Sequence, residues 1–227
     1  MDDNADNIVS FPSRDKPKPP PVINLPPVTK WLCALLLLIY AGMSLGLPPE
    51  RQYWIDTHFG FVSAAYTGGL PFTWPDVLAP LTYALLHGSW EHVIVNVLTL
   101  MAFGAGVERW LGSRRMFVLF VLCSLAAIAV QFALTPHAQD PVIGASGGLS
   151  GLFAAVLVLM RTQGAMPERK TLWLLAGLWV VTSALFGLFG GPDGEPVAWI
   201  AHIGGFLAGL GLVRLFTRSL RRFPVVR

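Results

Sequence analysis

The segment that decides the fold spans residues 141–160 and reads PVIGASGGLSGLFAAVLVLM. Its part from Ser146 to Met160 carries no charge and is apolar apart from Ser146 and Ser150. Fifteen residues of α-helix cover about 22 Å, whereas the hydrocarbon core of a bilayer is about 30 Å thick. This segment therefore predicts a short helix whose amino terminus, at Ser146, stops inside a membrane.

Five longer apolar stretches accompany this short one. The chain of 227 residues is 54% hydrophobic and only 13% charged, with a mean hydropathy of +0.58, which excludes an ordinary soluble domain. Most of the stretches approach the roughly 20 residues that a membrane-spanning helix needs. The sequence thus predicts an all-α membrane protein with six transmembrane helices: Trp31–Leu47, Leu85–Phe103, Met116–Leu134, Ser146–Met160, Leu172–Gly190 and Val197–Phe216.

The placement of basic residues predicts the orientation of these helices. If the amino terminus is cytoplasmic, fifteen of the sixteen Lys and Arg residues fall on the cytoplasmic side, and only Arg51 lies outside. Cytoplasmic segments of membrane proteins carry such an excess, so we expect both the N and C termini in the cytoplasm. The net charge of +3 reflects this asymmetry and gives no indication of nucleic-acid binding.

Three parts follow along the chain. Residues 1–27 are rich in proline and are expected to form a disordered cytoplasmic tail. Residues 28–217 form the predicted six-helix domain, with an outer loop at 48–83 whose many aromatic residues favour a position in the membrane interface. Residues 218–227 form a basic cytoplasmic tail.

Four polar side chains are predicted at similar depths in three helices. At 1.5 Å per residue from the cytoplasmic arginine of each helix, Ser146 lies about 22 Å up and His202 about 18 Å up. Asn96 and His92 lie about 20 Å and 25 Å up in the second helix. Polar groups are costly in hydrocarbon and usually functional there, so these four are the candidate site.

Helix faces support a meeting of Ser146 and His202. Small residues one turn apart let membrane helices approach closely. Both helices have them, Gly147 and Gly151 on one, Gly205 and Gly209 on the other. We therefore expect Ser146 within hydrogen-bond reach of His202.

This pair indicates nucleophilic catalysis. A serine at a helix amino terminus lies beside unpaired N–H groups that favour an oxyanion, and a histidine can take its proton. Every aspartate lies outside the predicted spans, Glu91 is turned away from His92, and Glu108 lies near the cytoplasmic end. A Ser–His dyad is therefore preferred to a triad.

The serine motif also allows two other interpretations. Ser150 repeats the Gly-x-Ser-Gly pattern one turn deeper, but it falls within the hydrogen-bonded part of the helix, so Ser146 is preferred. The run from Gly144 to Gly148 also fits the Gly-x-Ser-x-Gly elbow of soluble hydrolases. That elbow needs a preceding strand, which this sequence does not predict.

Four motifs together resemble the rhomboid intramembrane serine proteases over about residues 31–216. They are GASG at 144–147, AHIGGFLAG at 201–209, HGSWEHVIVN at 87–96 and GAGVERWLG at 104–112. The resemblance implies Ser146 as nucleophile and His202 as base, with His92, Asn96 and the Ser146 N–H stabilising the oxyanion.

The resemblance also implies transmembrane protein substrates within the lipid bilayer, a bacterial inner-membrane location, and no metal or cofactor. An inactive rhomboid-like protein that binds membrane clients is the alternative, and such proteins typically lack part of the site that is complete here. A channel or transporter is disfavoured, because the cytoplasmic half of the bundle is almost entirely apolar apart from Glu108.

Overall fold

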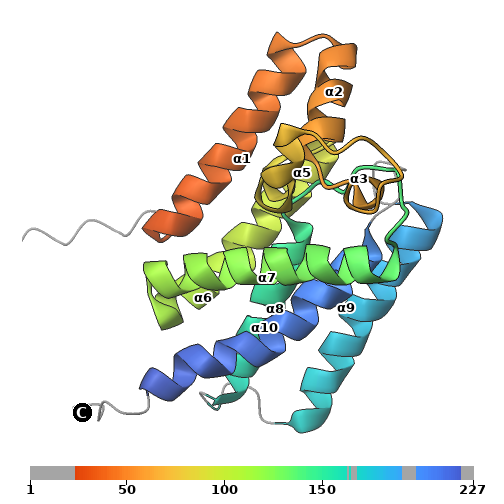
Figure 1. Cartoon of the computed structure of the whole chain (residues 1–227). Helices are drawn as coiled ribbons and strands as arrows, with labels where there is room; N and C mark the ends of the chain where they lie inside the picture. The colour runs from red at the N-terminus through yellow and green to blue at the C-terminus, as the bar shows by residue number, and fades with distance from the viewer. Residues whose placement is uncertain (1–23, 163, 165–167, 191–197, 221–227) are drawn as a thin grey trace, which may run out of the picture.

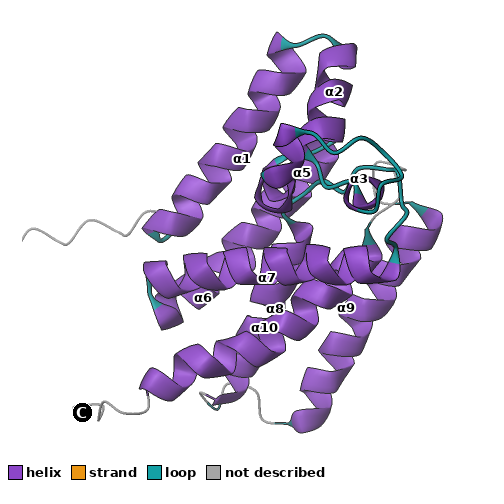
Figure 2. Cartoon of the chain, viewed as in Figure 1, coloured by secondary structure: helices purple, strands orange, loops and turns teal. Residues whose placement is uncertain are grey.

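The computed structural model describes residues 24–162, 164, 168–190 and 198–220, and within these ranges the chain is helical with no strand (Figures 1 and 2). One isolated antiparallel bridge joins Phe61 to Val142. Most of the predicted amino-terminal tail and residues 221–227 of the predicted carboxyl-terminal tail lie outside the described residues.

Five helical stretches are long and apolar enough to cross a membrane. A sixth apolar helix, α8, has only 17 residues. The all-α fold with several apolar helices is thus as predicted. The long stretches are α1 (Pro27–Gly46), Trp90–Leu111, α7 (Ser113–Leu134), α9 (Arg169–Phe189) and α10 (Trp199–Leu220).

The short helix begins where the sequence predicts. Helix α8 (Ser146–Thr162) starts at Ser146 and runs two residues past the predicted end at Met160. Its first intrahelical hydrogen bond joins the Leu149 N–H to the Ala145 carbonyl, 3.0 Å. The N–H groups of the first three residues of α8 therefore have no partner within the helix.

The second predicted span, Leu85–Phe103, has wrong boundaries. The helix begins at Trp90 and continues to Leu111 as α5 (Trp90–Thr99), a π-helical turn η3 (Leu100–Gly104) and α6 (Ala105–Leu111). Ser89 sets the start, because its hydroxyl accepts a 3.0 Å hydrogen bond from the His92 N–H and so caps the helix. Gly112, with φ of +83°, ends it.

The segment predicted as an outer loop at 48–83 is folded into short helices. Aromatic rings hold them together, with Phe59 at 5.6 Å from Trp74 and Phe61 at 4.8 Å from Tyr66 between ring centroids. The helices are α2 (Pro49–Phe59), α3 (Ser63–Tyr66), η1 (Trp74–Val77), α4 (Ala79–Thr82) and η2 (Tyr83–Leu85).

Helices α7, α8 and α10 pack most closely together and form the centre of the bundle (Figure 1). A Cβ on Gly205 would overlap the Gly147 carbonyl oxygen, and a Cβ on Gly209 would overlap the Gly151 carbonyl oxygen. The close approach predicted from the glycine spacing is therefore confirmed, since α8 and α10 touch backbone to backbone.

Glu108 joins the start of α1 to the end of the second span. Its buried carboxylate accepts hydrogen bonds from the Thr29 N–H and hydroxyl, both 2.7 Å, and from the Ser113 hydroxyl at 2.7 Å. It also accepts one from the Val28 N–H at 3.0 Å. Because these N–H groups belong to the first turn of α1, Glu108 serves as its cap.

Replacing Gly209 by Ala should destabilise the protein strongly. The added Cβ has only the backbone of Gly151 to displace, and overpacking of this kind costs about 3 kcal/mol or more. Gly211→Ala is the matched control, because nothing lies within 4 Å of its Cβ position. Thermal unfolding in detergent should show a large drop for Gly209→Ala and none for Gly211→Ala. Equal melting temperatures would contradict the packing.

Asp56→Asn should stabilise the protein at neutral pH. Burial raises the pKa of Asp56, on α2, from 3.8 to about 6, and its Oδ1 has no hydrogen-bond partner among the described residues. The folded state therefore holds this proton more tightly than the unfolded state. The stabilisation from the protonated Asp56 carboxyl is therefore complete below about pH 4, and it is lost as the pH rises through about 6.

The melting temperature of Asp56→Asn should accordingly exceed that of the wild type at pH 8, and the difference should disappear at pH 4. Asp140→Asn changes an exposed aspartate and serves as the control. A difference that is independent of pH would contradict the role of Asp56 ionisation.

Candidate active site

Ser146 lies at the first turn of α8. The chain just before it is held by hydrogen bonds to Phe61 and Tyr83. Val142 pairs with Phe61 through two backbone hydrogen bonds of 2.9 and 3.0 Å, and the Gly144 N–H donates to the Tyr83 carbonyl at 2.8 Å. The Tyr83 hydroxyl in turn donates to the Ser124 carbonyl of α7 at 2.7 Å. These bonds of Phe61 and Tyr83 thereby fix the turn that precedes Ser146.

Gly144 brings His92 next to this turn. A Cβ on Gly144 would lie 2.7 Å from the His92 Nε2 and 3.7 Å from the Ser146 Oγ. Its φ of +116° also lies in the left-handed region, which favours glycine. The nucleophile candidate on α8 and the imidazole on α5 are thus neighbours because residue 144 has no side chain.

His202 lies in the first turns of α10, with 8% of its surface exposed. The carbonyl of the preceding residue, Ala201, lies 3.7 Å from the Cβ position of Gly147, so the chain next to His202 contacts the chain next to Ser146. The structure therefore brings the first turns of α5, α8 and α10 close together.

The expected hydrogen bond between Ser146 and His202 is not formed. Neither ring nitrogen of His202 has a hydrogen-bond partner among the described residues. Hydrogen bonds between catalytic groups are often long without substrate and tighten in the reacting complex. The backbone contact of the two helices, at Gly147 with Gly205 and at Gly151 with Gly209, fixes the helices that carry the two residues.

Ser150 is engaged within its own helix. It is completely buried, and its hydroxyl donates to the Ser146 carbonyl at 2.8 Å. Ser146 is partly exposed. A nucleophile needs access to substrate, so this difference favours Ser146 over Ser150.

Asn96 and His87 flank His92. The Asn96 side chain is buried, and its Nδ2 donates to the His92 carbonyl one turn earlier at 2.9 Å, which leaves one N–H of that amide for another acceptor. His87, which the sequence places only at the rim of the helix, is buried, and its ring meets the His92 ring edge-on with centroids 4.9 Å apart. His87 was not among the predicted site residues. Its position five residues before His92 could have indicated that the two rings lie close together.

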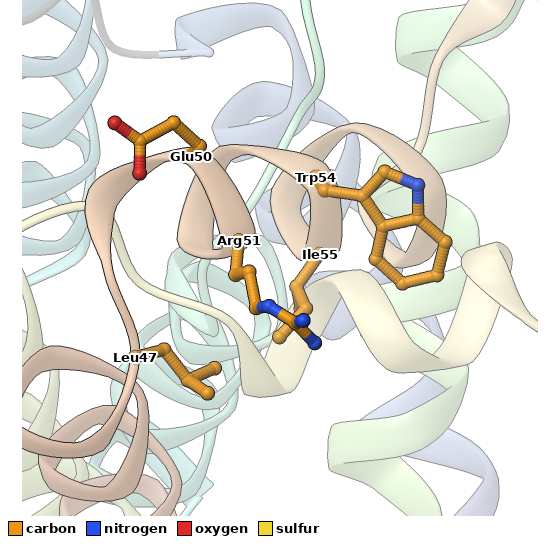
Figure 3. A pocket seen from close by; sticks show the side chains of 5 residues that line it. All are labelled: Leu47, Glu50, Arg51, Trp54 and Ile55. Carbon is orange, nitrogen blue, oxygen red and sulfur yellow. The ribbon is translucent and has the colours of Figure 1, made fainter.

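A separate hollow of about 510 Å³ lies at the start of α2, away from these residues (Figure 3). Its lining is mostly apolar, with the Arg51 side chain lying beside Ile55 and the Glu50 carboxylate turned away (Figure 3). None of the four candidate residues lines it. Its full lining is Leu47, Glu50, Arg51, Trp54 and Ile55.

Comparison with known proteins decides the family. The model of the rhomboid domain matches residues 76–219. The chain belongs to the rhomboid family. This match contains all four candidate residues, from His92 to His202.

Two kinds of relative are similar to this rhomboid chain. It is 32% identical over 133 residues to RHOMBOID-like protein 5 of Arabidopsis thaliana, covering 57% of this chain and 41% of the relative. It is 28% identical over 199 residues to the Rhomboid protease GlpG of Salmonella typhimurium, covering 86% of this chain and 65% of the relative. The chain thus spans only about two fifths to two thirds of the length of these relatives.

Proposed function

We propose that this rhomboid protein is an intramembrane serine endopeptidase that uses Ser146 and His202 as a dyad. The observation that carries the proposal is the junction of α8 and α10, where the start of a short helix with unpaired N–H groups lies beside the backbone that carries the buried His202. The similarity to GlpG, a rhomboid protease, supports the reaction class.

The reaction would proceed in two stages. His202 takes the Ser146 hydroxyl proton as the Oγ attacks the carbonyl carbon of the scissile peptide bond, and the resulting oxyanion accepts hydrogen bonds from the Ser146 N–H, His92 and Asn96. His202 then gives its proton to the leaving amine, and the C–N bond breaks to leave an acyl-enzyme. Water, deprotonated by His202, releases the second product and restores Ser146.

The short helix supplies the setting for this chemistry. With 17 residues, α8 spans about 25 Å, which is less than the hydrocarbon thickness. The turn before it would therefore border water within the outer part of the membrane, since irregular backbone at that depth must be buried in protein or line a wet cavity. Six membrane crossings, with both termini cytoplasmic, complete the proposed arrangement.

Substrates would be transmembrane proteins in the bilayer, and the relative from Salmonella supports a bacterial cell membrane. A helical substrate has its peptide groups paired, so its outer end must unwind locally before Ser146 can attack. The second candidate function is an inactive protein that binds membrane clients. The missing Ser146–His202 hydrogen bond favours this alternative, and reactivity of Ser146 separates the two.

Ser146→Ala should abolish labelling by a fluorophosphonate serine probe and cleavage of a transmembrane substrate, with expression unchanged. Ser150→Ala should keep at least part of both, because the Ser150 hydroxyl bonds only within its helix. Gel fluorescence of the detergent-solubilised protein measures labelling. Loss of labelling in Ser150→Ala alone would reverse the assignment, and a wild type that never labels would favour the inactive client-binding protein.

His92→Ala and Asn96→Ala should slow turnover while leaving Ser146 reactive to the probe. Loss of one oxyanion donor costs about 100- to 1,000-fold in kcat. Steady-state cleavage of the same substrate gives kcat, with probe labelling run in parallel. Full activity in the double variant would remove α5 from the site.

A further inference from the structure

Gln131 forms a hydrogen bond directly beside the proposed base. It lies near the carboxyl end of α7, has 8% of its surface exposed, and its Oε1 accepts a 3.2 Å hydrogen bond from the Ala201 N–H of α10. The two residues are 70 positions apart in the sequence. The bond therefore joins two helices at the residue that precedes His202.

This bond serves an N–H group that α10 itself cannot pair. The helix begins at Trp199, and its early intrahelical bond runs from the His202 N–H to the Ala198 carbonyl at 3.3 Å. The Ala201 N–H comes one residue earlier and belongs to the unpaired first turn. Gln131 thus caps α10 from a neighbouring helix.

Thr135 fixes which end of the Gln131 amide faces Ala201. The Thr135 hydroxyl donates to the Gln131 backbone carbonyl at 2.8 Å and accepts from the Gln131 Nε2 at 2.9 Å. Since the Nε2 end is held by this hydroxyl, the oxygen end faces the Ala201 N–H. The acceptor is therefore oriented by contacts at the end of α7 itself.

The opposite side of the same residue meets α8. The Ala201 carbonyl lies 3.7 Å from the Cβ position of Gly147, which directly follows Ser146. The backbone before His202 consequently lies between its hydrogen bond to Gln131 of α7 and the neighbouring backbone of α8. A shift of this backbone moves the imidazole relative to the Ser146 hydroxyl.

We propose that Gln131 is a positioning residue that sets His202 against Ser146 by anchoring the first turn of α10. This role rests on the proposed function, in which His202 is the base. Gln131 touches neither substrate nor reacting atoms, and acts through the Ala201 N–H.

The test compares two variants of Gln131. Gln131→Met keeps the length of the side chain but removes the acceptor, whereas Gln131→Glu keeps an acceptor oxygen. Misplacement of a catalytic group by about 1 Å costs on the order of 100-fold, so Gln131→Met should lower kcat about 10- to 100-fold with KM unchanged. Gln131→Glu should recover most of that loss.

Ser124→Ala is the matched control. It removes a buried hydroxyl of the same helix that bonds only to the Phe120 carbonyl, 2.9 Å away, and it should leave kcat unchanged. A fall in melting temperature of Gln131→Met with kcat unchanged would overturn the proposal in favour of a purely structural role. So would a loss of kcat that Gln131→Glu fails to recover.

Amide hydrogen exchange of the full chain, followed by mass spectrometry, separates this inference from the proposed function. Peptides that cover residues 199–205 should exchange faster in Gln131→Met than in the wild type and Ser124→Ala. If the wild type neither cleaves nor labels, the proposed function fails, and unchanged exchange would overturn the Gln131 anchor independently. Faster exchange together with reduced kcat is the result expected.

Discussion

The contact of α8 with α10 through bare backbone is the constraint on which the rest of the structure depends. Gly205 and Gly209 each face a carbonyl oxygen of α8 at a distance that leaves no room for a Cβ. Between apolar helices in lipid, close packing rather than the hydrophobic effect drives association. The helix that Ser146 begins and the helix that carries His202 can therefore adopt only a narrow range of relative positions.

The segment of short helices from Pro49 to Leu85 adds a second constraint, at the turn before α8. The Gly144 N–H is held by Tyr83, and the lack of a side chain at 144 admits the His92 imidazole. Helices α5, α8 and α10 thus meet at the turn around Gly144 and at the contact of α8 with α10. At both places only glycine fits. Each place aligns polar groups from different helices, which a flexible loop alone could not do because it would leave backbone groups unpaired in the membrane.

Much of this could be predicted from the sequence, because the bilayer imposes strong patterns. The lengths of the apolar runs predicted the helices, and the start of α8 at Ser146 was predicted from the short uncharged run of residues 146–160. The start of the second span was predicted five residues early, because the apolar run hides the Ser89 cap. The bond from Gln131 to Ala201 could not be predicted, since nothing local in the sequence pairs residues so far apart. The folding of residues 48–83 into short helices depends on ring packing between them, which periodicity does not reveal.

The buried polar side chains around the junction of α8 and α10 differ in how they are paired. Ser150 and Asn96 donate to carbonyls of their own helices, and Gln131 is paired at both ends of its amide. Each of these side chains has met the cost of burial with a hydrogen bond. The buried imidazoles of His202, in the same junction, and of His87, beside His92, have no such partner among the described residues. An unpaired polar group in a membrane helix destabilises the fold, and such groups are retained in membranes where they act. In the proposed function, the unpartnered ring nitrogens of His202 take the Ser146 proton and return it to the leaving amine.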